Sequence, residues 1–296
     1  MMYGAVPVKK VAETLMSAEQ MTAGLLGDTP QMSYVDKLNL FNHFAAPEIR
    51  HLLGEFGLKD GDVVLDAGCG TGVVTSWLYD RVGPNGHVIG LDLSLPHVRE
   101  AMQQRHQAAV PCYVQADISS PPFQASFDLI WCTNAINHLR QRLEGVRALV
   151  SALRPGGRLV LGQSGFLPDM MFAWDGRFDK AVRAACLRYY HDKYGLDESD
   201  TTGDRNLFGL LKQGGLARVT AKTIVIERTA PLTREDERYF VEGIFRAYWG
   251  HRLRPYLSAK DRNTLEQLCD PNSPKFCLRR PDFHHIQTLT ICSGFV

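Results

Sequence analysis

Three glycines at alternate positions follow a short apolar run in the first third of the chain. The stretch VVLDAGCGTGVV (residues 63–74) places Gly68, Gly70 and Gly72 shortly after Asp66. A glycine-rich turn that leaves a buried strand brings bare backbone close to a bound group, where a Cβ atom would collide. A dinucleotide, a nucleoside triphosphate and a sulfonium nucleoside all use such turns, so the turn alone leaves the ligand open.

Acidic residues end the next two apolar runs as well. Asp92 lies in GLDLS, where a carboxylate can accept hydrogen bonds from both hydroxyls of a ribose, and Asp117 lies in VQADI, placed to accept from an adenine amino group. For a single acid of this kind, the role of helix cap or turn residue would be favoured. Together with Asp66, they form three acids at successive strand ends around one glycine turn, which favours a nucleoside site.

The glycine spacing argues against two common ligands. A dinucleotide site uses G-x-G-x-x-G, whereas this turn reads G-x-G-x-G. A nucleoside-triphosphate loop ends in Gly-Lys-Ser/Thr, and no lysine follows these glycines. A nicotinamide-dependent oxidoreductase is therefore disfavoured.

Strand and helix patterns alternate around these residues. Apolar runs without alternation, typical of strands buried on both faces, occur at 63–67, 87–94, 112–117, 127–133 and 157–163. Amphipathic segments at 34–56, 73–82, 95–109, 143–153 and 204–216 predict helices. The alternation predicts an α/β fold of the doubly wound, Rossmann-like kind, with a mostly parallel sheet.

Two blocks outside the alternating pattern predict insertions. We expect an N-terminal helical cap (1–50), a nucleoside-binding core (51–165), a lid insertion (166–203), a continuation of the core (204–230), a second lid insertion (231–283) and a final core strand (284–296). Both insertions should emerge near the carboxyl ends of the strands, where ligands bind in such sheets.

Four stretches carry a family resemblance. VVLDAGCGTG, VIGLDLS, VQADISSPPFQASFDLIWCTNAINHL and LRPGGRLVL resemble the successive motifs of the class I S-adenosylmethionine-dependent methyltransferases. The likeness is greatest to the small-molecule branch, including the ubiquinone/menaquinone-biosynthesis type, and covers about residues 60–165. It implies S-adenosylmethionine as the cofactor and a seven-stranded sheet whose last strand, HIQTLTICSGF, is antiparallel.

The resemblance also implies roles for single residues around the methionine part of the cofactor. Gly68, Cys69 and Gly70 would lie against the methionine portion, and Asp66 would help to orient its amino end. Asp92 would bind the ribose diol.

The same resemblance assigns the adenine side. Leu93 would pack on the adenine face, while Asp117 and the backbone of Ile118 would contact the adenine edge. Thr133 and Asn134, just past the fourth strand, would lie beside the methionine and the sulfonium. Tyr34, in the N-terminal stretch, resembles a tyrosine that many relatives place over the cofactor.

The cofactor determines the expected mechanism. Its methyl group is already activated by positive sulfur, so transfer is an in-line displacement that needs alignment and the exclusion of water. A general base helps only if the acceptor must lose a proton. His138 and His43 are the candidate bases, although a lone histidine near such a site is more often structural.

Aromatic residues gather in both insertions. Trp174, Tyr190, Tyr248 and Trp249 are the candidate substrate contacts, and they predict an apolar or aromatic acceptor. Packing of the lid's own core explains these residues equally well.

Composition and charge exclude several classes of function. The chain has 296 residues, a formal net charge of +1, 45% apolar and 22% charged residues. Such a charge offers no basic face for nucleic acid, and no apolar run reaches the roughly 20 residues that span a bilayer. We expect a cytoplasmic protein with a small-molecule substrate, no nucleic-acid partner and no membrane span. A helix predicted at 8–26 could pack on the lid of its own chain or exchange with a neighbouring subunit. The sequence therefore leaves open whether the protein forms a homo-oligomer.

The cysteines do not form a metal-binding pattern. Seven cysteines are scattered along the chain without a CxxC pair. We therefore expect reduced thiols and no metal site.

Two hypotheses of different class follow. The first is a methyltransferase acting on a small, largely apolar or aromatic metabolite, in keeping with natural-product biosynthesis. The second is a non-methylating S-adenosylmethionine-binding protein that assists a cyclisation or serves a partner. The glycine and acid pattern encodes binding and not turnover, so it leaves the second hypothesis open.

Overall fold

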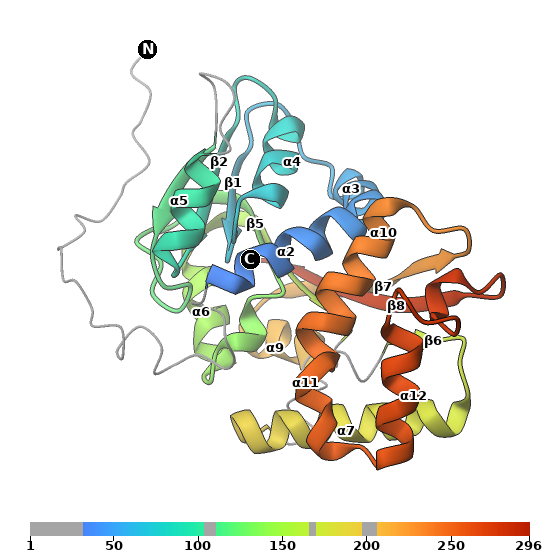
Figure 1. The fold of residues 1–296 in the computed structure, drawn as a ribbon. Helices are drawn as coiled ribbons and strands as arrows, with labels where there is room; N and C mark the ends of the chain where they lie inside the picture. Colours follow the sequence, from blue (N-terminus) through green and yellow to red (C-terminus); the bar gives the residue numbers. More distant parts are fainter. Residues whose placement is uncertain (1–31, 104–110, 166–169, 197–205) are drawn as a thin grey trace.

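A single mixed β-sheet organises the chain (Figure 1). The computed structural model describes residues 32–103, 111–165, 170–196 and 206–296. The sheet has eight strands in the order β3-β2-β1-β4-β5-β8-β6, with β7 also paired to β8. The strands are β1 (Val63–Ala67), β2 (His87–Asp92), β3 (Cys112–Gln115), β4 (Phe127–Thr133), β5 (Leu153–Ser164), β6 (Met171–Phe172), β7 (Ala217–Thr229) and β8 (His284–Phe295).

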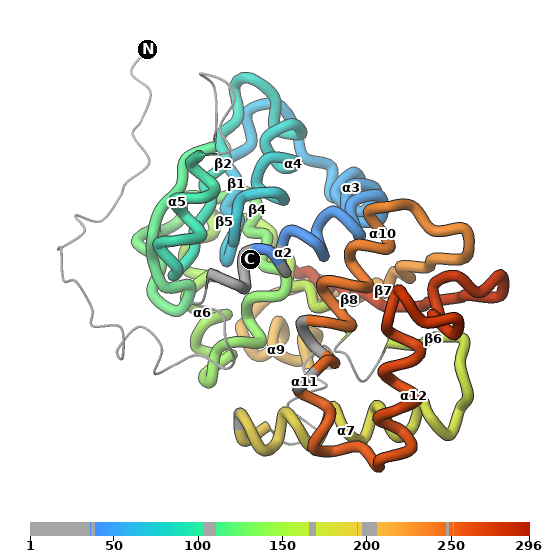
Figure 2. Tube along the Cα trace, viewed as in Figure 1, coloured from blue at the N-terminus to red at the C-terminus, as the bar shows by residue number. Residues whose placement is uncertain are grey.

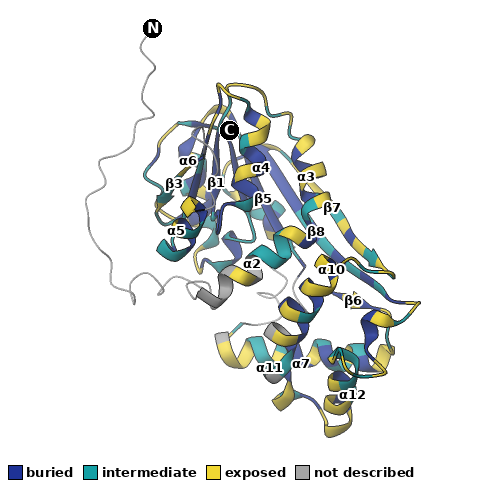
Figure 3. Cartoon of the chain, turned by 45° about the horizontal axis from the view of Figure 1, so that its top comes forward, coloured by how far each residue is buried: buried dark blue, intermediate teal, exposed yellow. Residues whose placement is uncertain are grey.

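The predicted doubly wound fold is confirmed. Strands β1 to β5 run parallel, and β8 is antiparallel to β5, β6 and β7. Two hydrophobic clusters lie on the two sides of the sheet, one including α3 and α4 and the other including α6 and α9. The helices of this core are α3 (Ala46–Gly54), α4 (Val73–Val82), α5 (Leu95–Gln103), α6 (Arg142–Ala152) and α9 (Leu207–Gln213). Figure 3 shows β1, β5 and β8 as mostly buried strands between more exposed helices.

The strand number differs from the expected seven. The additional strand is β6, whose Met171 and Phe172 pair with Ile286 and His285 of β8. Strand β5 pairs with β8 only as far as Leu289 of β8. The first residues of β8, from His284, therefore extend beyond the end of β5. The two-residue strand β6 therefore covers backbone groups that this extension would otherwise leave unpaired.

The N-terminal helical stretch is divided in two. The sequence predicts one helix over 34–56, whereas the structure has α2 (Met32–Phe44) and α3, separated at Ala45. Pro47 lies in the first turn of α3, where its missing N–H costs no helical hydrogen bond. The helix predicted at 8–26 lies outside the described residues.

The two segments predicted to be insertions contain mainly helices, although the first also adds β6 to the sheet. The first contributes β6 and α7 (Gly176–Tyr194). The second contributes α10 (Arg234–Arg238), a π-helix (Tyr239–Trp249), α11 (Gly250–Leu253) and α12 (Ala259–Cys269). Helices α7, α11 and α12 lie together at one end of the molecule, beyond the sheet (Figures 1 and 2). A large aromatic cluster is formed by residues of β6, the segment after it, α7 and the π-helix, among them Phe172, Trp174, Phe178, Phe245 and Trp249.

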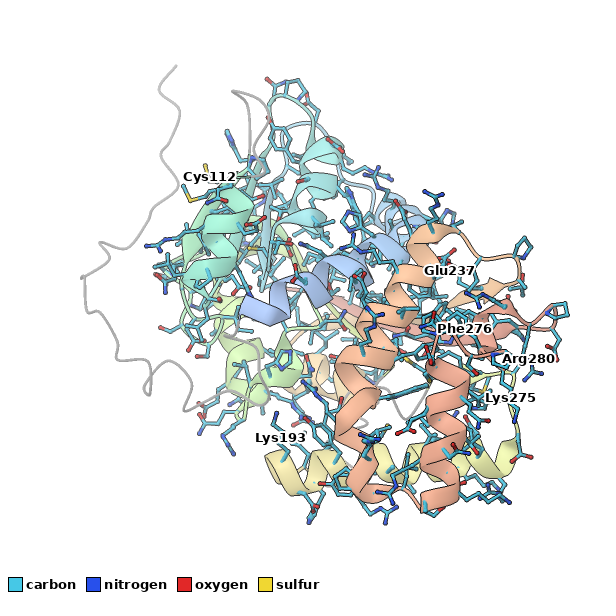
Figure 4. The ribbon with its side chains drawn as sticks, viewed as in Figure 1. Cys112, Lys193, Glu237, Lys275, Phe276 and Arg280 are labelled. Carbon is cyan, nitrogen blue, oxygen red and sulfur yellow. The ribbon has the colours of Figure 1, made fainter. Side chains whose placement is uncertain are left out.

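All seven cysteines are free thiols. Five of them are buried, whereas Cys112 at the start of β3 is exposed (Figure 4). No helix in the described part of the chain combines the length and the apolar character needed to cross a membrane.

Candidate active site

The glycine turn is fastened to the end of the neighbouring strand. The amides of Gly68 and Cys69 donate to the carbonyl of Leu91, at 2.7 and 2.9 Å. The amide of Gly70 donates to Oδ2 of Asp92 at 2.9 Å. The Asp92 carboxylate therefore lies directly beside the turn and restrains its conformation, while its contact with a ribose stays a prediction.

Gly68 is required by both its backbone conformation and its surroundings. Its φ is +79°, in the left-handed region that favours glycine. A Cβ atom at this position would lie 2.4 Å from the Cβ of Ala135, in the segment that follows β4. The glycine thus lets the loops after β1 and β4 approach each other closely.

Replacing Gly68 by alanine should lower the free energy of unfolding by about 2 to 3 kcal/mol, because it combines backbone strain with a steric clash. Gly156 offers a matched control, since it has the same φ of +79° and nothing within 4 Å of an added Cβ. Gly156→Ala should cost about 1 kcal/mol from strain alone. Urea unfolding of both variants measures the difference, and equal losses would show that the contact with Ala135 has no effect.

Asp66 is a buried acid at the end of β1. It is 3% exposed and accepts a 2.6 Å hydrogen bond from the hydroxyl of Thr75. Burial raises the pKa of Asp66 to about 7, the Thr75 hydrogen bond opposes this, and the negative charge of Asp92 adds to it. Asp66 can therefore exchange a proton near neutral pH.

The segment after β3 forms a tight turn around Asp117. Its Oδ1 accepts from the amide of Ser119 at 2.8 Å, and its main-chain carbonyl accepts from the amide of Ser120 at 3.0 Å. The next residue, Ile118, is buried, whereas Leu93, after β2, is half-buried. These three residues lie after the carboxyl ends of the neighbouring strands β2 and β3.

Asn134 joins the ends of β4 and β5. It follows Thr133, whose hydroxyl oxygen accepts from the indole of Trp131 at 3.0 Å. Asn134 has a left-handed φ of +53°, and its Oδ1 accepts from both the amide and the hydroxyl of Ser164, at 2.8 and 3.0 Å. The side-chain oxygen of Asn134 is thereby committed to β5.

Helix α2 contacts the glycine turn. The hydroxyl of Thr71, within the glycine turn, donates to the side-chain oxygen of Asn39 at 2.5 Å. Phe44, the last residue of α2, stacks on Tyr239 of the π-helix with 4.0 Å between the ring centroids. No sequence pattern indicated a role for Asn39, because its partner lies 32 positions away.

Comparison with known families agrees with this arrangement of glycine turn and strand-end acids. Residues 64–157 match the family described as "Methyltransferase domain". The chain carries a class I S-adenosylmethionine-dependent methyltransferase domain. The match runs from β1 to the start of β5 and includes the glycine turn, Asp66, Asp92, Asp117 and Asn134, whereas Asn39 and Ser164 lie outside it.

Similar proteins share this methyltransferase domain. A malonyl-[acyl-carrier protein] O-methyltransferase of Pseudescherichia vulneris is 36% identical over 126 residues, which are 42% of this chain and 48% of that protein. The 27-O-demethylrifamycin SV methyltransferase of Amycolatopsis mediterranei is 32% identical over 122 residues, 40% of this chain and 44% of that protein. The chain thus spans less than half the length of these two relatives.

A solved structure with a related fold is an S-adenosylmethionine-dependent methyltransferase from Aquifex aeolicus. It has a TM-score of 0.45 and 19% sequence identity, and the match covers 59% of this chain and 81% of that one.

The two candidate bases differ in their position relative to the methyltransferase domain. His138 ends a short 3₁₀ helix (Ile136–His138) after Asn134, and it is half-buried. His43 lies on α2, is exposed, and has its Nδ1 2.7 Å from the carbonyl oxygen of Asn39. A role as general base stays a prediction for both histidines. Tyr34 belongs to α2, but its side chain lies outside the described part of the structure.

Two of the four candidate substrate residues lie in the aromatic cluster of the insertions. Trp249 is 1% exposed and packs against Phe172 at 5.2 Å and Trp174 at 5.3 Å, between ring centroids. Trp174 is half-buried, and its indole N–H donates to Asp179 at 3.1 Å. Both residues pack the core of the insertions, and substrate contact stays a prediction for each.

The other two candidate substrate residues, Tyr190 and Tyr248, lie on α7 and on the π-helix. Tyr190, on α7, is half-buried and contacts Tyr189 edge to face, with 5.7 Å between ring centroids. The side chain of Tyr248 lies outside the described residues.

Proposed function

We propose that this chain transfers the methyl group of S-adenosylmethionine to a small, largely apolar or aromatic metabolite. The observation that carries the proposal is the Asp92 carboxylate at the end of β2, held beside the glycine turn by the Gly70 amide. A carboxylate fixed in this position can accept the two hydroxyls of a ribose.

The residues around the turn fit a nucleoside cofactor. Asp92 and Asp117 supply acceptors for hydroxyl and amino donors. The hydroxyl of Ser94 and the side-chain oxygen of Asn137 are buried without a hydrogen-bond partner among the described residues. Buried polar atoms of this kind are costly unless a ligand or water satisfies them. When bound, the cofactor supplies a methyl group already activated by a positive sulfur.

The acceptor class follows from the insertions and from the relatives. Phe172, Trp174 and Trp249 contact one another within a single aromatic cluster. The matched relatives are named as methylating a malonyl group on a carrier protein and a rifamycin. The aromatic cluster and the rifamycin relative favour a largely apolar acceptor, partly enclosed by the cluster, whereas the malonyl group of the other relative carries a carboxylate.

The chain's own residues would align the two reactants and exclude water. Asn134 and Thr133 lie at the end of β4 and would flank the reacting centre, while α2 closes the cofactor side through Asn39. In-line displacement needs chiefly this alignment. His138 would accept a proton from acceptors that must lose one.

Calorimetry tests the cofactor assignment. Asp92→Ala should weaken the binding of S-adenosylhomocysteine about 100-fold, because two hydroxyl donors lose a charged acceptor. Asp80→Ala removes an exposed acid of α4 and serves as the control, for which we expect unchanged binding. A folded wild-type protein that binds neither S-adenosylmethionine nor S-adenosylhomocysteine would overturn the assignment.

A turnover assay separates transfer from binding alone. The protein should release S-adenosylhomocysteine when it is incubated with S-adenosylmethionine and an active member of a panel of phenols, aromatic polyketides and carrier-bound acids. Tight binding of the cofactor without product from any class of acceptor would instead favour the non-methylating hypothesis.

A further inference from the structure

A buried histidine faces the carboxylate of Asp92. His97 lies in the first turn of α5, is 3% exposed, and has its Nδ1 3.3 Å from Oδ1 of Asp92. It shares the buried face of α5 with Val98 and Ala101. An imidazole on such a face is costly unless a polar neighbour compensates for the loss of water. Asp92 is one such neighbour.

The backbone already fixes both oxygens of this carboxylate. Oδ2 accepts from the amide of Gly70 at 2.9 Å, and Oδ1 accepts from the amide of Ser94 at 2.8 Å. A carboxylate offers about four acceptor positions, so about two remain for His97 and a ligand together. His97 approaches the oxygen that Ser94 also contacts, and its ring therefore limits how the carboxylate can turn.

Ser94 supplies an independent sign that this cluster is built for a ligand. It directly precedes α5, where a serine hydroxyl ordinarily accepts from an amide in the first helical turn. Here the hydroxyl is buried, and no described residue is its hydrogen-bond partner. The residue as a whole is 7% exposed. A hydroxyl-bearing ligand on Asp92 would satisfy it.

We propose that His97 is a positioning residue for the ribose of the cofactor. Its ring holds the Asp92 carboxylate in the orientation that accepts the diol, and its N–H stabilises the negative charge once the nucleoside excludes water. Charged hydrogen bonds gain strength in such a desolvated setting. The proposal rests on the proposed function, because it takes the ligand of Asp92 to be S-adenosylmethionine.

The test compares apolar and polar replacements of the ring. His97→Leu should raise the Kd of S-adenosylhomocysteine about tenfold, the loss expected when a carboxylate loses one polar neighbour. His97→Asn places an amide N–H near the position of Nδ1 and should restore binding to within about threefold of wild type. His97→Met provides a second apolar variant, and thermal unfolding identifies the variants that fold.

A double-mutant cycle shows whether His97 acts through Asp92. In an Asp92→Asn background, His97→Leu should have little further effect on the Kd, because the charge that it stabilises is gone. The 2′-deoxy analogue of S-adenosylhomocysteine should likewise distinguish wild type from His97→Leu less than the parent compound does. A purely structural role for His97 would leave the effect unchanged in both comparisons.

The outcomes separate this inference from the proposed function. Failure of the folded wild-type protein to bind S-adenosylhomocysteine would overturn both. Binding by wild type and loss in Asp92→Ala, together with unchanged affinity in a folded apolar variant of His97, would overturn the positioning role alone. Additive effects of Asp92→Asn and His97→Leu would also overturn it.

Discussion

Replacing Arg228 by methionine should lower the free energy of unfolding by about 3 to 5 kcal/mol, the cost of removing one member of a buried charge network. Arg228 lies near the end of β7 and is 14% exposed. Its guanidinium pairs with Glu48 of α3 at 2.6 Å and with Asp236 of α10 at 2.9 Å. It also donates to the carbonyl of Phe44 at the end of α2.

The loss of Arg228 should be costly because the two carboxylates that it pairs with are largely shielded from water in the folded protein. The side chains of Glu48 and Asp236 are 20% and 12% exposed. Without the guanidinium, both partly buried carboxylates would lose their positive partner, and Asp236 would keep only its hydrogen bonds from Thr233. Methionine fills much of the volume of the arginine stem, so the measured loss would report charge and hydrogen bonds more than a cavity.

Lys222 provides the control on the same strand. It pairs with Glu55 at 2.5 Å, but the two side chains are 52% and 38% exposed. Exposed pairs contribute about 1 kcal/mol or less, so Lys222→Met should have a small effect in the same urea titration. If Arg228→Met costs no more than Lys222→Met, the network does not fasten the N-terminal helices and the second insertion to the sheet.

The core of the fold was predictable because its signals are local. Unbroken apolar runs identified β1, β2, β3 and β4, and the glycine turn identified the edge of the sheet where the acids meet. Asp92 lies beside Gly70, as the strand order requires. These features follow from residues close together in sequence, or from the regular crossover of parallel strands.

The contacts that join distant segments were not predictable. Arg228 and Glu48 are 180 positions apart, and Thr71 and Asn39 are 32 apart. No periodic pattern specifies such pairs. His97 was also overlooked, because a histidine in an amphipathic helix reads as one more polar residue until the fold turns it toward Asp92. The strand β6 was too short, at two residues, to leave a pattern.

Helix α2 connects the glycine turn, where the cofactor is proposed to bind, with the second insertion, where the acceptor is proposed to bind. Asn39 contacts the glycine turn, and Phe44 contacts both Tyr239 and the Arg228 network. Tyr239 in turn donates a 3.0 Å hydrogen bond to Gln287 of β8. Helix α2 therefore contacts the glycine turn, the π-helix of the second insertion and the Arg228 side chain of β7. We expect a displacement of any one of these parts to shift the others.

Beside this junction, His285 should make the protein less stable in acid. The residue is 0% exposed, and its ring lies among Phe172, Phe240 and Phe44, with ring centroids 4.6, 4.8 and 6.0 Å away. The pKa of His285 is lowered from 6.5 to about 3, chiefly by burial and also by the positive charge of Arg228, while a hydrogen bond with Gln287 opposes the shift. The folded protein thus keeps this ring neutral where the unfolded chain protonates it.

The direction of the effect follows from proton uptake. Between about pH 6.5 and 3 the unfolded state binds a proton at His285 that the folded state does not, so stability falls as the pH falls. Down to pH 5 the loss is about 2 kcal/mol, and across the whole window it is on the order of 5 kcal/mol. His285→Leu removes the titrating group and should abolish this loss.

Asp66 provides a matched comparison because its slope has the opposite sign. Its pKa is raised to about 7 from 3.8, so between these values the folded state holds a proton that the unfolded state has lost, and stability falls as the pH rises. The two groups therefore oppose each other between about pH 5 and 6.5. Urea unfolding across this interval should show stability falling more steeply with rising pH in His285→Leu than in wild type, and rising with pH in Asp66→Asn. Slopes equal to wild type in both variants would contradict the assignment of these two buried groups as the source of the pH dependence.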